Sequence, residues 1–293
     1  MNKKIKGWAV RIMLLLSLSF SVSCDGEMLE SLASSGDTVS ALKEALVIGS
    51  KVAASKLGEE GGYLNDALVK IGLPEEVAVI AELLQTDAGK TFLTATGAEG
   101  MEPENLVLLM NRAAEKAAPE SAEIFANAIT SMTVEDGEQI LFGADNAATE
   151  YLKGKTYTGL QSTFGEVVTG TFSEVSVGGK NLNDFWSGFS SGYNKIADFK
   201  NSIMGNVAMM ALHEGLKTAG KEELYNKIDA IQSVNTNLGE YVTGKALDGL
   251  FLKVADKEAD IRTNVEALNC CKRCSDVWIS IIVNKIKSFN EYL

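Results

Sequence analysis

Apolar residues recur at helical spacing along most of the chain. Between residues 39 and 57 they stand three or four positions apart, which is the spacing of one face of an α-helix. Asp37 is placed to cap the start of this segment, and the glycine-rich run from Gly58 to Gly62 ends it. The pattern predicts a first helix with a buried stripe made of Val39, Leu42, Leu46, Gly49, Ala53 and Leu57.

The three prolines mark further helix starts. Pro74, Pro103 and Pro119 each precede a segment with helical apolar spacing. Proline is favoured in the first turn of a helix, because its missing N–H would have no partner there. Thr133 and Asp136 have the spacing of a capping box, in which each side chain accepts a backbone N–H of the other residue, so another helix is predicted to begin there.

The second half of the chain continues the helical pattern. Asp145 is placed to cap a long segment, and the stretch from Thr236 to Arg262 keeps helical spacing. The stretch from Thr169 to Gly179 fits a helix or a strand. Ala, Leu, Glu and Lys are frequent throughout, and they favour helices. We therefore predict an all-α fold, a single compact domain of antiparallel helices over residues 37–264.

The first 23 residues have the pattern of an export signal. Four basic residues precede a short apolar run, residues 12–20, which cannot span a bilayer. Small residues then lead into Cys24 as in the lipobox of bacterial lipoproteins, although Ser21 stands where leucine is usual. We predict a lipoprotein signal peptide at 1–23, lipidation of Cys24 and a polar tether at 24–36. The alternative is a buried N-terminal helix.

Cleavage after residue 23 would leave a strongly acidic protein. It would remove four of the 27 basic residues and none of the 39 acidic ones, so the net charge would be 23 − 39 = −16. Such a chain repels nucleic acid and anionic lipid surfaces. We expect it in the bacterial cell envelope, facing the periplasm or the cell surface, with the acyl anchor as its membrane contact.

Most catalytic and cofactor motifs are incomplete. His213 is the only histidine, whereas a zinc site needs three or four His or Cys ligands. The two GKT triplets lack the first glycine of a P-loop. GFSSG offers Ser190 as a nucleophile, but it lies in a segment with helical apolar spacing. We predict no cofactor and no metal; a calcium site or a carboxylate-based hydrolase stays open.

One predicted helix carries a concentrated set of polar residues. Asn111 and Glu115 are four positions apart and share a face, and Arg112 can reach Glu115 three positions on. These side chains could line a cleft. The alternative, which we favour, is an Arg–Glu surface pair that stabilises the helix.

Four separated motifs resemble one family. EGGYLNDALVKIGLPEE, MNRAAEKAAPESAEIF, ILFGADNAATEYLKGKT and YVTGKALDGLFLKVADKEADIR are similar, in this order, to exported bacterial proteins grouped as domain of unknown function 4197. The resemblance spans about residues 37–262 and implies an exported helical domain, without an activity. The polar positions that it marks as a candidate cleft or binding site are Asn65, Asn111, Arg112, Glu115, Asp145, Thr149, Lys155, Thr156, Lys245 and Asp248.

The chain departs from that family pattern in two places. An extra helical stretch at about residues 197–233 contains His213, so the histidine cannot serve a family-wide mechanism. The tail, residues 265–293, holds Cys270, Cys271 and Cys274, which lack a fourth zinc ligand and would leave an odd thiol in disulfides. Shifting the reading frame turns Asn269 and Cys270 into Leu-Leu, and the codon that straddles Arg273 and Cys274 then encodes Met, Val or Leu, as in the usual ending of the family. We therefore favour a frameshifted tail over a divergent helix.

Three functions are compatible with these observations. We favour a non-catalytic envelope lipoprotein that binds an apolar ligand or a protein partner between its helices. The second is a carboxylate-based hydrolase that uses Glu115 and Asp145, which requires both side chains in one pocket. The third is a purely structural lipoprotein, in which no polar cluster forms a cleft.

Overall fold

The computed structural model describes residues 38–98, 101–232, 234 and 236–263. The predicted signal peptide, Cys24, the tether, the Asp37 cap and the tail from residue 265 lie outside this part of the chain. Within it, helices dominate, and the predicted all-α fold is confirmed.

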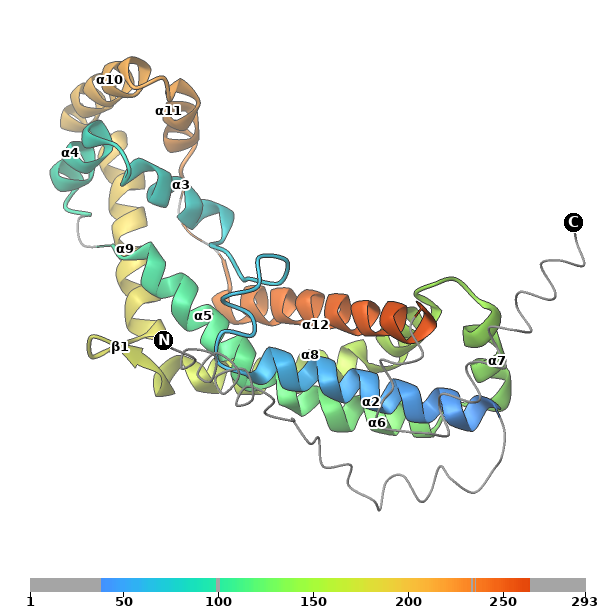
Figure 1. The fold of residues 1–293 in the computed structure, drawn as a ribbon. Coiled ribbons are helices and arrows are strands. Elements are labelled where there is room, and N and C mark those ends of the chain that lie inside the picture. The colour runs from blue at the N-terminus through green and yellow to red at the C-terminus, as the bar shows by residue number, and fades with distance from the viewer. Residues whose placement is uncertain (1–37, 99–100, 233, 235, 264–293) are drawn as a thin grey trace, which may run out of the picture.

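The helices form two arms that meet at a bend (Figure 1). The long arm contains α2 (Thr38–Gly58), α6 (Ser121–Thr130), α7 (Val134–Phe142), α8 (Ala147–Glu174) and α12 (Leu238–Thr263). The short arm contains α3 (Glu75–Leu83), α4 (Asp87–Thr96), α9 (Leu182–Lys200), α10 (Ile203–Thr218) and α11 (Glu222–Asp229). Helix α5 (Pro103–Ala117) runs from the short arm into the long one, and a 3₁₀ turn, η1 (Ala118–Glu120), joins it to α6.

Long helices at opposite ends of the sequence build the core of the long arm. Helix α12 packs along α8 and α2, and α5 and α6 pack against both α2 and α8. The stripe predicted for α2 is buried, with Leu42 and Leu57 exposed over 3% and 1% of their surface. Buried residues of both arms belong to one hydrophobic cluster, so the arms form a single domain.

A small hairpin connects the arms. Strands β1 (Ser176–Val177) and β2 (Lys180–Asn181) pair antiparallel, with Ser176 opposite Asn181. Gly178 and Gly179 form the two-residue turn with φ of 59° and 82°, which glycine adopts without steric cost. The stretch that fitted a helix or a strand therefore does both, since α8 continues to Glu174 before the hairpin begins.

Most predicted helix boundaries are confirmed. Pro103 is the first residue of α5, and Pro74 directly precedes α3. The capping box of Thr133 and Asp136 opens α7 with both hydrogen bonds formed. The cap predicted at Asp145 is wrong, because α8 begins after Asn146 and no local side chain caps it.

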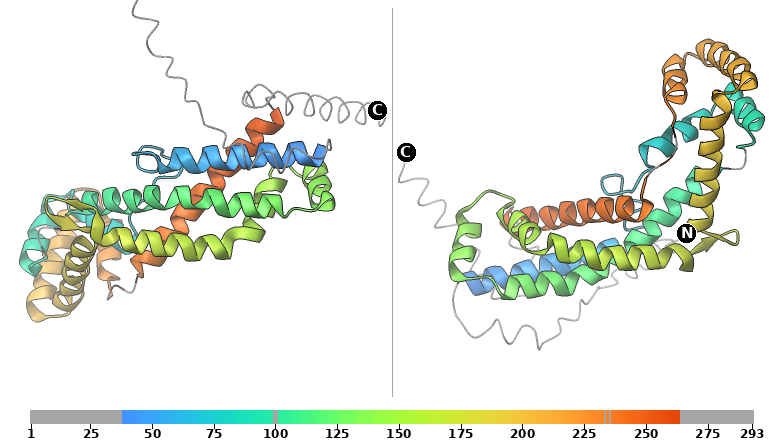
Figure 2. Two further views of the ribbon diagram at one scale, coloured as in Figure 1. Left: turned by 90° about the horizontal axis from the view of Figure 1, so that it is seen from below. Right: turned by 180° about the vertical axis from the view of Figure 1, so that it is seen from behind.

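The two ends of the described chain lie at the same end of the molecule. Helix α2 starts, and α12 stops, near α7 at the tip of the long arm (Figures 1 and 2). Helix α10 lies at the opposite extreme, at the tip of the short arm. A tether joined to α2 would therefore attach far from α10.

Candidate functional site

Asn111 holds an irregular loop against α5. The loop covers residues 59–74, between α2 and α3. The Asn111 side chain is fully buried; its Oδ1 accepts the backbone N–H of Ile71 at 2.9 Å, and its Nδ2 donates to the Ile71 carbonyl at 2.8 Å. Nδ2 also donates to the Val107 carbonyl at 2.7 Å. This amide thus satisfies backbone groups that the loop cannot pair by itself.

Glu115 binds the same loop one helical turn later. Its Oε1 accepts the backbone N–H groups of Tyr63 and Leu64, both at 3.2 Å. Its Oε2 accepts from Arg112 at 2.5 Å, and Arg112 also pairs with Glu60 at 2.8 Å. Glu115 is exposed over only 4% of its surface and the Arg112 side chain over 23%, so the predicted surface pair is in fact partly buried.

Tyr63 also fixes this loop in place. We call Asn111, Arg112, Glu115 and Tyr63, with the contacts that hold residues 59–74, the loop anchor. Its ring is fully buried, and its hydroxyl donates to the Ala246 carbonyl of α12 at 2.7 Å. Burial raises the pKa of Tyr63 well above its usual value, and the nearby Glu115 carboxylate raises it further. The phenol therefore stays protonated as a hydrogen-bond donor, which joins the loop to α12.

A second buried polar cluster lies at the start of α8. Glu258 of α12 accepts the backbone N–H of Ala148 at 2.9 Å and that of Thr149 at 2.8 Å. It also accepts the Thr149 hydroxyl at 2.8 Å and forms a 2.7 Å ion pair with Arg262. Arg262 donates to the Ile140 carbonyl at the end of α7. Glu258 therefore caps α8 from another helix.

The structure divides the predicted site residues among different places. Asn111, Arg112 and Glu115 meet at the loop anchor, whereas Thr149 belongs to the Glu258 cluster. Thr156 is buried and donates back to the Leu152 carbonyl within α8. The remaining members are exposed; they are Asn65, Asp145, Lys155, Lys245 and Asp248.

Glu115 and Asp145 are not neighbours in these networks. Both oxygens of Glu115 are occupied by loop N–H groups and Arg112, and Asp145 lies exposed in the turn between α7 and α8. The described residues also contain no group of three His, Cys, Asp or Glu side chains placed to hold a metal ion.

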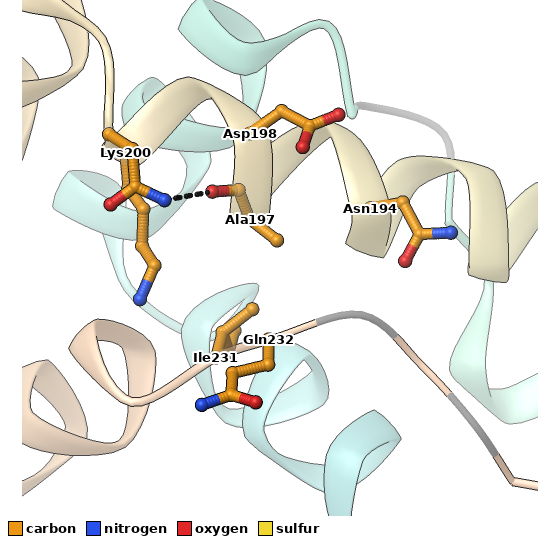
Figure 3. A pocket seen from close by; sticks show the side chains of 7 residues that line it. Asn194, Ala197, Asp198, Lys200, Ile231 and Gln232 are labelled. Atoms are coloured by element: carbon orange, nitrogen blue, oxygen red, sulfur yellow. Dashed lines mark hydrogen bonds between the residues drawn. The ribbon is translucent and has the colours of Figure 1, made fainter.

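The hollows of the described surface are open and lined by mixed side chains. One, of about 620 Å³, lies between α9 and the segment after α11 (Figure 3). Asn201 donates to the Ala197 carbonyl at 2.9 Å at the end of α9, and Asn194 accepts from the Val234 N–H at 3.2 Å. Its other lining residues are Asp198, Lys200, Ile231 and Gln232. These groups offer little apolar surface to a ligand.

Ser190 lies within α9 and not at a strand-to-helix turn. Its hydroxyl is buried without a hydrogen-bond partner in the described part of the chain. The flanking Phe185 and Phe189 are buried, as their spacing predicted. A nucleophile needs an exposed hydroxyl beside a base, and this environment offers neither.

The most unusual surface is the outer face of α10. Ile203, Met204, Val207 and Met210 are exposed over 88%, 76%, 62% and 66% of their surface. They lie on one side of the helix, opposite the buried Met209, Leu212 and Leu216 that face α4 and α9. We call these four residues the α10 face.

Sequence reasoning missed both Glu258 and the α10 face. Glu258 and Arg262 have the i, i+4 spacing of a helical ion pair, a signal that was present. The α10 face had a signal too, since residues 201–212 contain no charged side chain. None of the helices described between residues 38 and 263 is long and apolar enough to cross a membrane.

Comparison with known proteins gives a family and no closer relative. No curated protein and no solved structure matches the chain. The sequence model of one family, described as protein of unknown function (DUF4197), matches residues 32–270. That match includes every described helix and both polar clusters. The chain therefore belongs to the DUF4197 family.

Proposed function

We propose that this protein is a lipid-anchored protein of the bacterial envelope that acts as a non-catalytic interaction module. Its contact surface is the α10 face. The observation that carries the proposal is the exposure of four large apolar side chains on one side of one helix. Single exposed apolar residues are common, but a contiguous group is typical of interaction sites.

The state of the polar motif residues supports a non-catalytic role. Asn111, Glu115 and Glu258 are buried, and each is engaged by backbone groups of another segment. Such side chains stabilise a particular chain path, and their hydrogen-bonding atoms are not free to bind a substrate. The mixed lining of the open hollows likewise favours a protein partner over an apolar ligand.

The anchor is tested by Cys24→Ser in the full chain, expressed in a bacterial host. We expect the unchanged protein in the membrane fraction and the variant in the soluble periplasmic fraction. A variant that stays with the membrane would contradict the anchor.

The contact surface is tested with a photo-crosslinking amino acid in place of Met210. On irradiation of intact cells we expect a discrete adduct of higher mass. Met204→Glu should abolish it, since a charge on the α10 face opposes burial. Phe142→Glu is the matched control, because Phe142 is 76% exposed at the far end of the molecule, and it should leave the adduct unchanged. Absence of any adduct would count against the interaction module.

A further inference from the structure

The α10 face is suited to contact a copy of itself. Ile203, Val207 and Met210 follow one another at i, i+4 and i+7, so they form a straight apolar ridge about 10 Å long. No charged side chain occurs between Asn201 and Leu212. Two such ridges can therefore approach without bringing like charges together, although the protein as a whole is acidic.

From this geometry we infer that the occupant of the α10 face is the α10 face of a second copy, paired antiparallel about a two-fold axis at Val207. In this two-fold arrangement, a residue that lies a given number of positions before Val207 meets the partner's residue that lies the same number of positions after Val207. Val207 meets the partner's Val207, and Met204 meets the partner's Met210. Ile203 meets the partner's Ala211, a small side chain that leaves room for it.

The end of the ridge also fits this arrangement. Glu214 lies on the same side of α10, one turn beyond Met210. In the antiparallel pair it comes beside the start of the partner's α10, where backbone N–H groups favour a negative charge. The first acidic residue after the uncharged stretch is thus placed where it adds attraction.

A lipid surface is a poorer occupant than a second copy. Helices that lie in a membrane interface present aromatic side chains on the apolar face and basic ones beside it. The α10 face has no aromatic or basic member. It also lies at the opposite end of the molecule from the start of α2 (Figure 1), to which the predicted tether would be joined.

The size of the face predicts a weak, reversible dimer. Four large aliphatic side chains bury roughly 200–400 Å² per copy. A standard stable interface buries about 800 Å² per partner. Tethering both copies to one membrane raises their effective concentration and offsets this deficit. The inference therefore rests on the proposed anchored interaction module, and the dimer is expected at the membrane.

The test uses the full chain carrying the Met210 photo-crosslinker, co-expressed in two versions with different epitope tags. We expect one main adduct of twice the monomer mass, and isolating it through one tag should also recover the other tag. A photo-crosslinker at Phe142 is the positional control and should give no such adduct. An adduct that carries one tag and a different protein would overturn the second copy but leave the proposed function standing. No adduct at Met210 would overturn both.

Charge reversal tests the two-fold axis. Val207→Glu in both copies should lower the yield of the two-tag adduct about tenfold or more, because two carboxylates would face each other. Val207→Lys in both copies should do the same. Co-expression of a Val207→Glu copy with a Val207→Lys copy should restore the two-tag adduct, since opposite charges then meet at the two-fold axis. Val207 is exposed, so both variants should keep the thermal midpoint of the unchanged protein. Failure of the mixed pair to restore the adduct would overturn the pairing at Val207.

Discussion

Asn111 acts toward Ile71 as a neighbouring strand would, by pairing with both its N–H and its carbonyl. Asn111→Ala leaves these two backbone groups without a partner. We expect the free energy of unfolding to fall by about 2–4 kcal/mol, measured by urea denaturation. Hydrogen exchange should locate the effect, with loss of protection at the Ile71 amide.

Asn65→Ala is the matched control for that change. Asn65 is another polar motif residue of the family, but its side chain is exposed on the loop itself. Its removal should change the free energy of unfolding by no more than about 0.5 kcal/mol. Equal effects at both positions would contradict the role given to Asn111.

Glu258 is the residue on which the start of α8 depends. Glu258→Ala removes the cap from Ala148 and Thr149 and leaves Arg262 without its partner. Breaking a buried pair from one side costs about 3–5 kcal/mol, and we expect a loss of this size in urea denaturation. Asp248→Ala, on an exposed position of the same helix, should lower stability by less than about 0.5 kcal/mol.

Two carboxylates make the fold sensitive to acid. The hydrogen bond from Lys253 lowers the pKa of Asp66, and that from the Thr133 backbone lowers the pKa of Asp136, both below the usual 3.8. A carboxylate whose pKa is lower in the folded protein than in the unfolded chain stabilises the fold at pH values above its unfolded-state pKa. This stabilisation is lost as the pH falls through the folded-state pKa. Denaturation midpoints should therefore drop below about pH 4. Asp66→Asn should lower the midpoint at pH 7 and make the acid loss shallower; an unchanged pH profile would contradict its role.

Contacts between residues close in sequence could be predicted, whereas contacts with residues far away in sequence could not. Arg112 reaches Glu115 because a helix places positions i and i+3 together. The other partners of Glu115, the N–H groups of Tyr63 and Leu64, come from a loop more than fifty residues earlier. Only the packing of that loop on α5 makes Glu115 a buried anchor and not a surface residue.

At the scale of elements, α8 shows why a local rule can fail. Asp145 is a good capping residue by type, but the first N–H groups of α8 are already bound by Glu258, 110 and 109 residues further on. The start of a helix leaves several backbone N–H groups without an intrahelical partner, and a buried carboxylate that also holds Arg262 is a stronger acceptor for them than an exposed aspartate. The capping group therefore comes from α12, whereas α8 itself lies where the apolar pattern predicted a helix.

Helix α12 offers a matched pair of glycines that tests its packing on the loop. A Cβ on Gly249 would lie 2.9 Å from the Tyr63 ring and 3.1 Å from Val69, whereas one on Gly244 would meet nothing within 4 Å. Gly249→Ala should cost about 1–3 kcal/mol through overpacking. Gly244→Ala should instead stabilise by about 0.5–1 kcal/mol, since alanine favours a helix interior. Thermal unfolding measures both, and effects of the same sign would contradict this packing.

At the scale of the whole molecule, the all-α class could be predicted from the helical spacing of apolar residues, whereas the bent shape could not. Helical spacing predicted the segments of both arms, because each helix buries one stripe. The bend depends on how α9 leaves the β1–β2 hairpin and on α5 spanning both arms, which are relations between elements (Figure 1). The α10 face is likewise a property of the assembled arm. A helix apolar on all sides can be buried or half exposed, and only its neighbours decide which.

The packing of α2 against α12 has a consequence for how the domain forms. Gly49 of α2 lies beside Ile261 of α12, so the first described helix needs the last one to complete its core. A contact between segments so far apart in sequence is slow to close and comes late in folding. A chain synthesised from its N-terminus therefore cannot complete this domain until α12, the last described helix, has been made. In an exported protein, that delay would keep the polypeptide loose enough to be threaded through a membrane channel before it folds.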